Sequence, residues 1–126
     1  MSLRYKILLE STFNIESREE RIEEIKAFID LIINESVGLV ISRTLFTDLC
    51  QLLCKLTIEE SKTISIYALD KIQPRGISFE DQVTNYRQYL SEIYEREGDF
   101  KKAANILSGI PLETSQKFVL SFFYLK

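Results

Sequence analysis

The sequence has no histidine, no tryptophan, only two prolines and only four glycines among its 126 residues. Without histidine, a protein lacks the commonest general base, the usual partner of a nucleophilic serine or cysteine, and most zinc sites. The isolated glycines form no phosphate-binding loop of the G-x-x-x-x-G-K-S/T or G-x-G-x-x-G type. A hydrolase built on two carboxylates is the remaining enzymatic alternative, but the carboxylates fall on helix faces beside basic residues. We therefore expect no catalytic residue, no metal or cofactor site, and no enzyme activity.

An excess of charge of one sign is also missing. Lysine and arginine number 16 and acidic residues 19, which gives a net charge of −3 and a pI of about 5.1. This balance provides no general attraction to nucleic acid or to anionic membranes. No run reaches the roughly 18 apolar residues of a membrane-spanning helix, and residues 1–12 are too short and too charged for a signal peptide. We expect neither nucleic acid nor a membrane as a partner.

Cysteine is scarce as well, and Cys50 and Cys54 are four residues apart in a strongly helical window. Helical neighbours at this spacing rarely have disulfide geometry, and a free cysteine behaves as a small buried hydrophobe. We expect two buried structural thiols and an intracellular context.

Helical periodicity runs along nearly the whole chain, because so few prolines and glycines interrupt it. It predicts helices over residues 3–12, 17–35, 39–56 and 58–72. Three capping patterns support helix starts: Ser17 with Glu20, Thr57 with Glu60, and Ser78 with Asp81. The apolar residues of the first two helices that are expected to pack are Leu3, Ile7, Leu8, Ile22, Ile25, Phe28, Ile29, Ile32 and Ile33. The third helix is apolar over much of its circumference, so we expect it between neighbours on several sides, with Leu39, Val40, Ile41, Leu45, Phe46, Leu49, Leu52, Leu53 and Leu56 as its apolar residues. The inner face of the fourth helix is expected to hold Ile64, Tyr67, Ala68 and Ile72.

Charged residues in these helices are interpreted as surface. The run SREERIEEIK, residues 17–26, is typical of a solvated face with its glutamates near a helix start. Arg43 and Asp48 interrupt the broad apolar surface of the third helix, so we expect them to mark its exposed edge. The fourth helix has the weakest pattern, because Thr63 and Ser65 dilute its inner face.

Residues 78–111 predict two amphipathic helices joined by a tight turn. The first carries one apolar seam whose members step by four and three: Phe79, Val83, Tyr86, Leu90 and Ile93. Gly98 suits a left-handed helix end, and Asp99 can cap the next helix, whose inner residues are Phe100, Ala103, Ala104 and Leu107. The positions that match the tetratricopeptide pattern are Leu90, Tyr94, Gly98, Phe100, Ala103 and Leu107.

Such a hairpin cannot bury its apolar face alone, so it predicts neighbours on both sides. The expected fold class is all-α, with stacked antiparallel helical hairpins in a tetratricopeptide- or HEAT-like right-handed solenoid. Tyr86, Tyr89 and Tyr94, with Arg87 and Arg96, offer an alternative as stacking platforms for single-stranded nucleic acid. Packing is the favoured interpretation, since the tyrosines lie on or beside the seam and nearby glutamates offset the arginines.

Four stretches carry a further signal in their order and spacing. They are LVISRTLFTDLC (39–50), DKIQPRGISFEDQV (70–83), RQYLSEIYEREGDFKKAANIL (87–107) and GIPLETSQK (109–117). Together they resemble the N-terminal helical-repeat region of the COP-9 signalosome subunit 4 family, whose members are PCI-domain proteins. KIQPRGISFE and GIPLETSQK carry the specificity, and the resemblance extends over residues 3–117.

The resemblance implies a non-catalytic scaffold of a cytoplasmic and nuclear complex that removes the ubiquitin-like neddylation mark from cullins. In that family the helical arm helps receive cullin–RING ligases, including the RING-box subunit, while a different subunit is the metal-dependent isopeptidase. On this basis residues 1–117 are the N-terminal helical-repeat arm, and residues 118–126 are an atypical apolar tail where the pattern is lost. Nothing corresponds to the PCI winged-helix domain, so we expect a fragment, a truncated isoform or a shortened gene product.

Two other functions stay open at this point. One is a PCI scaffold subunit of the proteasome-lid type, the nearest confusable relative. The other is a free tetratricopeptide-like adaptor, which would bind a peptide carboxylate through a clamp such as Lys101, Lys102 and Asn105. No partner-binding residue can be assigned from motifs alone.

Overall fold

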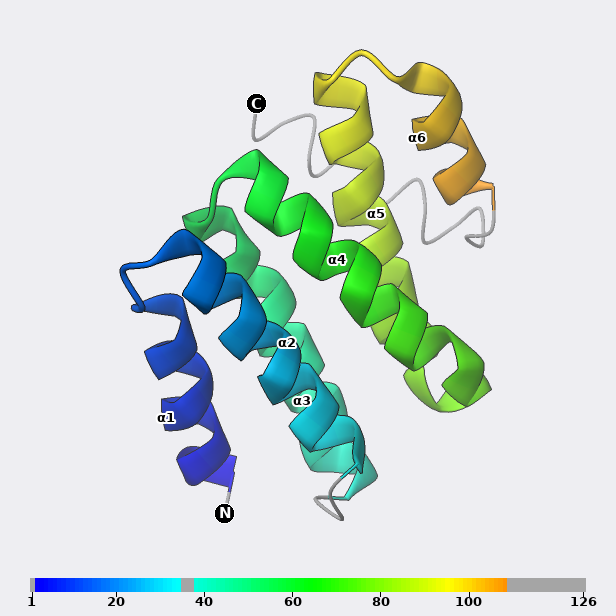
Figure 1. Cartoon of the computed structure of the whole chain (residues 1–126). Helices are drawn as coiled ribbons and strands as arrows, with labels where there is room; N and C mark the ends of the chain where they lie inside the picture. The colour runs from blue at the N-terminus through cyan, green and yellow to red at the C-terminus, as the bar shows by residue number, and fades with distance from the viewer. Residues whose placement is uncertain (1, 35–37, 109–126) are drawn as a thin grey trace.

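The computed structural model describes residues 2–34 and 38–108, and these residues form six α-helices, two 3-10 segments and no strand (Figure 1). The elements are α1 (Ser2–Phe13), α2 (Arg18–Asn34), α3 (Leu39–Leu52), η1 (Leu53–Lys55), α4 (Ile58–Ile72), η2 (Gln73–Phe79), α5 (Glu80–Arg96) and α6 (Phe100–Leu107). The predicted all-α fold is confirmed. The stretch GIPLETSQK and the apolar tail 118–126 lie outside the described residues.

The helices lie in two layers. In Figure 1, α2 and α4 are side by side in front, and α3 and α5 are side by side behind them. At one end α1 contacts both α2 and α3, and at the other end α6 packs against α5. The central helix α4 contacts α2 in its own layer and α5 in the other layer, so it joins the two ends of the molecule.

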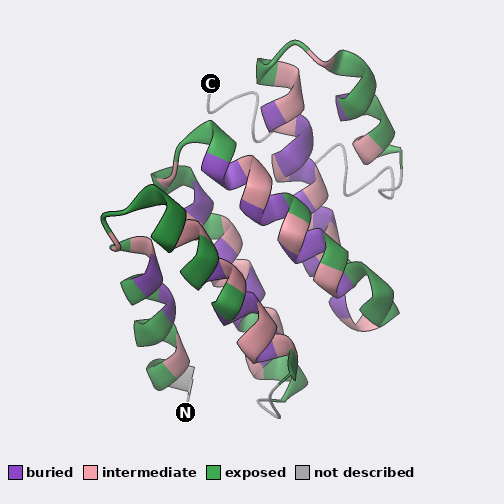
Figure 2. Cartoon of the chain, in the orientation of Figure 1, coloured by how far each residue is buried: buried purple, intermediate pink, exposed green. Residues whose placement is uncertain are grey.

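The core follows the predicted apolar stripes of the middle helices, and its residues appear purple in Figure 2. Tyr86 is fully buried, and its hydroxyl donates a hydrogen bond to the carbonyl oxygen of Phe46 at 2.6 Å. The ring of Phe46 meets the rings of Phe79 and Tyr86 edge-on, at centroid distances of 5.8 and 6.4 Å. These contacts hold α3 against α5, because they combine apolar burial with preferred aromatic geometry.

Two of the three predicted capping patterns are confirmed. The hydroxyl oxygens of Ser17 and Thr57 accept hydrogen bonds from the backbone N–H groups of Glu20 and Glu60. Asp99 also caps α6 as predicted, with its carboxylate accepting from the N–H of Lys102 at 3.2 Å.

The third pattern, Ser78 with Asp81, is wrong. Helix α5 begins at Glu80 after Phe79, and no side chain caps its start. The segment Gln73–Phe79 folds instead into 3-10 turns that bend at Gly76, whose φ of 71° favours glycine. The carbonyl of Ser78 accepts a hydrogen bond from Nε of Arg43 at 2.6 Å, so this corner is held by α3 rather than by its own side chains.

The inner faces of the terminal helices also differ from the prediction. Leu3, Ile7 and Leu8 are 68%, 58% and 43% exposed, whereas Leu9 is fully buried. In α6, Phe100 is 66% exposed and only Ala103 among its apolar residues is buried. Within residues 2–34 and 38–108, α1 packs chiefly on α2 and α3 and α6 packs on α5, so periodicity alone does not identify which of their apolar residues are covered.

Smaller corrections concern α3 and α4. Helix α3 ends at Leu52, four residues short of the prediction, and the chain continues as a 3-10 turn. Leu39 and Val40 of its predicted apolar surface are 43% and 73% exposed, so the start of α3 is not covered as expected. Ser65, which had weakened the pattern of α4, is fully buried in it. Cys50 is partly buried, and burial raises the pKa of its thiol to about 12, but Cys54 is exposed rather than buried.

Replacing a seam residue by alanine tests the assignment of the core. Leu90 is 2% exposed, so Leu90→Ala should lower the free energy of unfolding by about 2–5 kcal/mol through loss of burial and the cavity left behind. The matched control Leu3→Ala, at an exposed leucine, should change it by less than about 0.5 kcal/mol. Urea unfolding followed by circular dichroism measures both, and equal effects would show that the wrong face was placed inside.

Candidate protein-interaction site

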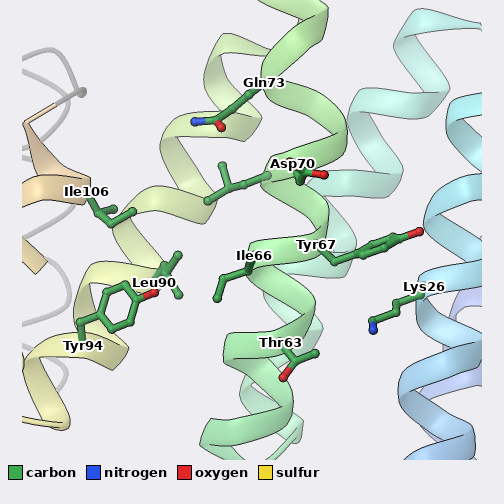
Figure 3. A pocket seen from close by; sticks show the side chains of 10 residues that line it. Lys26, Thr63, Ile66, Tyr67, Asp70, Gln73, Leu90, Tyr94 and Ile106 are labelled. Atoms are coloured by element: carbon green, nitrogen blue, oxygen red, sulfur yellow. The ribbon is translucent and has the colours of Figure 1, made fainter. Parts of the chain in front are cut away.

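A groove of about 610 Å³ opens between α4, α5 and α6 on the front of the molecule (Figure 3). Its floor is apolar and combines residues from all three helices, namely Ile66 and Leu69 of α4, Leu90 of α5 and Ile106 of α6. Ile66 is 46% exposed, which places an aliphatic side chain in contact with solvent at the centre of the groove. Concave apolar surfaces with a few polar groups are the usual sites of ligand and partner binding.

Two tyrosines lie on opposite sides of α4, and each lies under two lysine ammonium groups. Tyr94 of α5 lines the groove beside Leu90, whereas Tyr67 points from α4 towards α2 (Figure 3). The Nζ atoms of Lys26 and Lys71 are 5.4 and 5.1 Å from the ring centroid of Tyr67. Lys62 and Lys102 are 6.0 and 5.6 Å from the ring centroid of Tyr94. Cation–π attraction at these distances orders the lysine side chains over the aromatic rings.

Three of these lysines also form ion pairs with carboxylates, so the rim of the groove is polar but not strongly charged. Nζ of Lys62 lies 2.9 Å from the carboxylate of Glu97, and this hydrogen bond raises the pKa of Lys62. Lys102 lies 3.7 Å from the carboxylate of Asp99, and Lys71 lies at the same distance from Asp30. An apolar floor inside a polar rim is the composition of a typical protein interface.

The hydroxyl of Tyr67 is fixed by the carboxylate of Asp30 on α2. It lies 2.7 and 2.8 Å from the two carboxylate oxygens. The hydrogen bond to Asp30, followed by burial, raises the pKa of Tyr67 to about 12, because ionisation would place a phenolate beside a carboxylate. Tyr67 therefore ties α4 to α2, the neighbouring helix of the front layer.

The most important polar cluster was missed by the sequence analysis, which had placed residues 17–26 on a solvated face. Glu60 is 1% exposed, and its two carboxylate oxygens accept hydrogen bonds from Nη2 and Nε of Arg21 at 2.5 and 3.0 Å. Arg18 pairs with the neighbouring Glu59 and lies 3.6 Å from Glu60. Nη1 of Arg21 donates to the carbonyl of Ile15 at 2.7 Å.

These contacts change the pKa values of the groups involved. The hydrogen bond to Glu60 raises the pKa of Arg21, and the hydrogen bond from Arg18 lowers the pKa of Glu59. The sequence marks Glu60 only as part of a capping pattern with Thr57 at the start of α4. The sequence analysis therefore assigned the Glu60 carboxylate to the helix cap. In the structure this carboxylate binds Arg21 of α2, a contact that sequence spacing does not reveal.

The structure separates the other residues considered from sequence. Tyr86 belongs to the core, which agrees with the packing interpretation, and Tyr94 lines the groove. Lys101 and Asn105 of the considered carboxylate clamp are exposed and do not line the groove. Arg43 and Asp48 are partly buried rather than at an exposed edge.

Across residues 2–34 and 38–108, no three acidic, cysteine or histidine side chains gather in a way that would hold a metal ion. None of the helices in this part of the chain combines the length and apolar character needed to cross a bilayer.

The fold and the groove define the class of protein: an all-helical protein with an apolar groove on its surface. Comparison with known proteins narrows this class, because the family described as "PSMD12/CSN4, N-terminal" matches residues 2–120. The chain therefore belongs to the PSMD12/CSN4 N-terminal family.

The similar curated proteins include COP9 signalosome complex subunit 4 from three distant organisms. The Drosophila melanogaster protein is 43% identical over 114 residues, which cover 90% of this chain and 28% of the relative. The Arabidopsis thaliana protein is 37% identical over 115 residues, which cover 91% of this chain and 28% of the relative. The Dictyostelium discoideum protein is 34% identical over 116 residues, which cover 92% of this chain and 28% of the relative. The chain thus spans little more than a quarter of the length of these relatives.

The buried ion pair gives a stability prediction. Arg21→Met should lower the free energy of unfolding by about 2 kcal/mol or more, because it leaves the Glu60 carboxylate buried without its main partner. The double variant Arg21→Met with Glu60→Met should recover much of the loss. Glu23→Ala, which removes an exposed ion pair to Lys26, is the control and should cost less than about 0.5 kcal/mol. If thermal unfolding shows equal losses for Arg21→Met and Glu23→Ala, the pair has no structural role.

The contact of Tyr67 with Asp30 gives a pH prediction. The pKa of Tyr67 is raised to about 12 in the folded chain, chiefly by its hydrogen bond to Asp30. The stabilisation that this contact provides is therefore fully present below about pH 10, the ordinary tyrosine pKa, and is lost as the pH rises towards 12. Titration of the Cζ signal of ¹³C-labelled tyrosine should show this residue unionised at about pH 11. In Asp30→Asn the pKa should fall towards its ordinary value. An unchanged titration in Asp30→Asn would contradict the assigned cause.

Proposed function

We propose that this chain is a non-catalytic interaction segment of the COP9 signalosome subunit 4 type. The observation that carries the proposal is the family match over residues 2–120, together with the relatives named as subunit 4 of that complex. The absence of histidine from the whole sequence fits a segment that supplies binding surface rather than an active site.

The architecture proposed for this role is a right-handed stack of helical hairpins. In this proposal α1 with α2, α3 with α4, and α5 with α6 would be the hairpins of a tetratricopeptide- or HEAT-like solenoid. The alternation of layers supports it, since α2 lies beside α4 and α3 lies beside α5. Solenoids present long continuous surfaces, and such surfaces suit the binding of large partners.

The proposed partners are other signalosome subunits and components of cullin–RING ligases, including the RING-box subunit. The segment would hold the ligase so that a separate isopeptidase subunit reaches the neddylation bond, in the cytoplasm and the nucleus. The groove between α4, α5 and α6 is the proposed contact surface. Its exposed Ile66 and the ordered Tyr94 beside Lys62 and Lys102 offer the apolar centre and polar rim of an interface.

A proteasome-lid role is the second candidate, because the description of the matching family also names PSMD12. The curated relatives described above favour the signalosome instead. The carboxylate-clamp adaptor has less support, since Lys102 is engaged with Asp99 and Tyr94 while Lys101 and Asn105 lie outside the groove.

A binding experiment with three particles distinguishes these functions. The 126-residue chain is immobilised and titrated with a purified cullin–RING ligase, with signalosome subunits lacking subunit 4, and with a proteasome lid lacking the PSMD12 subunit. We expect binding to the ligase or the signalosome subunits and not to the lid. A folded chain that binds neither of the first two contradicts the proposed function, and stronger binding to the lid supports the second candidate.

Two matched variants test the groove separately. Ile66→Glu places a charge on the groove floor and should weaken binding about tenfold or more. Ile77→Glu introduces the same charge at an isoleucine that is 84% exposed on η2, outside this groove, and should leave the affinity unchanged. If binding occurs but both variants behave alike, the function stands and this groove is not the contact surface.

A further inference from the structure

Helix α5 is covered on every side along its middle. All of residues 82–95 are buried or partly buried, and this part of α5 is purple and pink in Figure 2. Its neighbours in the stack differ, because the middle of α2 exposes Glu23 and Glu24 and the middle of α4 exposes Ile66 and Asp70. A helix that lies at the surface of a stack normally keeps one such polar side in water.

Three sides of α5 face helices described above. The hydroxyl of Tyr86 donates to the carbonyl oxygen of Phe46 in α3, and Leu90 lies in the groove beside residues of α4. Nη1 of Arg87 donates to the carbonyl oxygen of Ile106 in α6 at 3.1 Å. These contacts place α3, α4 and α6 around α5 and leave one further side.

This remaining side, here called the fourth face, carries Thr84, Gln88 and Glu92, which recur at every fourth position. Gln88 precedes Leu90 by two residues, so the two side chains point about 160° apart, and Gln88 faces away from the groove. Thr84 and Gln88 are 7% and 1% exposed, and the side chain of Glu92 is 11% exposed. A polar ridge with so little exposure has a neighbour, and the contacts of α3, α4 and α6 lie on the other sides.

The amide of Gln88 shows what kind of neighbour fits. Neither its Nε2 nor its Oε1 has a hydrogen-bond partner within residues 2–34 and 38–108. A buried amide without partners is costly, and it needs both an acceptor and a donor. Every peptide group of a main chain other than that of proline offers one of each. The fourth face therefore suits a stretch of polypeptide laid along α5.

Residues 109–126 of this chain are placed to supply that stretch. They follow α6, whose Ile106 lies beside Arg87 near the level of Gln88. Thr84 and Glu92 are eight residues apart, or about 12 Å along the helix axis, which is well within the reach of this segment. Residues 118–125 are almost all apolar and need cover from water.

The charges of the segment and of the fourth face are complementary. Residues 109–126 contain Lys117 and Lys126 against one acidic residue, Glu113, whereas the fourth face carries the carboxylate of Glu92. A segment of positive net charge is attracted to an acidic ridge.

We propose that residues 109–126 pack along the fourth face of α5, with the apolar side chains of residues 118–125 against the ridge and a main-chain peptide group paired with the Gln88 amide. The segment continues the back layer beyond α5 and covers the end of the stack, as terminal units of helical repeats do. The groove between α4, α5 and α6 stays open. This contact is independent of the proposed function.

A spin label on the segment tests the contact in the full chain. The label is attached at Ser121→Cys in a chain that also carries Cys54→Ser, while Cys50, with a thiol pKa of about 12, stays unlabelled at neutral pH. The amide signals of the ¹⁵N-labelled chain around Gln88 and Glu92 should lose most of their intensity. Those of α1, at the other end of the molecule, should keep theirs (Figure 1).

Matched variants connect the signal to the proposed contact. Phe118→Asp with Phe122→Asp places two charges in the apolar stretch, so the lost intensity should return and the side-chain amide of Gln88 should exchange faster with water. Phe100→Asp, at a residue of α6 that is 66% exposed, is the control and should change neither. A label at Ser11→Cys, on the exposed side of α1, should leave the amide signals around Gln88 unchanged.

Three results would overturn the proposal. One is full intensity around Gln88 with the label at Ser121→Cys. Another is a stronger loss at Ile66 of α4 than at Gln88, which would place the segment in the groove. The third is an intensity loss in a mixture of spin-labelled ¹⁴N chains and unlabelled ¹⁵N chains, because the segment would then come from a second copy.

Discussion

The pairing of Arg21 with the buried carboxylate of Glu60 is the constraint on which the front layer depends. Glu60 is at the start of α4, where a charged group with 1% exposure is tolerated only because a guanidinium from α2 satisfies both of its oxygens. The pair fixes how α4 lies along α2. Because α4 also packs on α5, this pair links α2 to the second half of the described chain.

The back layer is fixed by different chemistry. Tyr86 of α5 is buried against Phe46 of α3 and donates its hydroxyl proton to a backbone carbonyl of that helix. Specific polar contacts therefore join the helices within each layer, surrounded by aliphatic packing that is much less directional. Together these contacts leave one side of α4 facing the groove, with Ile66 exposed at its centre and Tyr67 held in place by Asp30.

Much of this arrangement could be predicted from the sequence. The helices of the middle of the chain follow from uninterrupted periodicity, and their starts follow from Ser17 and Thr57, because those signals act within a few residues. The exposure of Phe100 and Leu3 could not be predicted, since it depends on which helices pack against α6 and α1. Neither could the role of Glu60, because its partner is 39 residues away and its local pattern has a different explanation.

The residues that line the groove could not be predicted from the sequence either. Its lining residues come from α2, α4, α5 and α6, and no motif joins Lys26 to Tyr67 or Ile66 to Ile106 before the chain folds. The family resemblance did identify the right relatives, because it rests on stretches such as KIQPRGISFE that are contiguous in sequence. It assigned no contact residue, and the groove described above now supplies specific ones to test.

The central claim is that this chain is a preformed helical arm that binds partners through an exposed groove, without refolding its core. Hydrogen–deuterium exchange of the free chain and of the chain bound to a signalosome or cullin–RING particle tests it most directly. The account predicts that the backbone amides of α4 and α5 exchange slowly in both states. New protection on binding should be confined to the groove-lining segments. Rapid exchange of α4 and α5 in the free chain, with protection appearing only on binding, would contradict it.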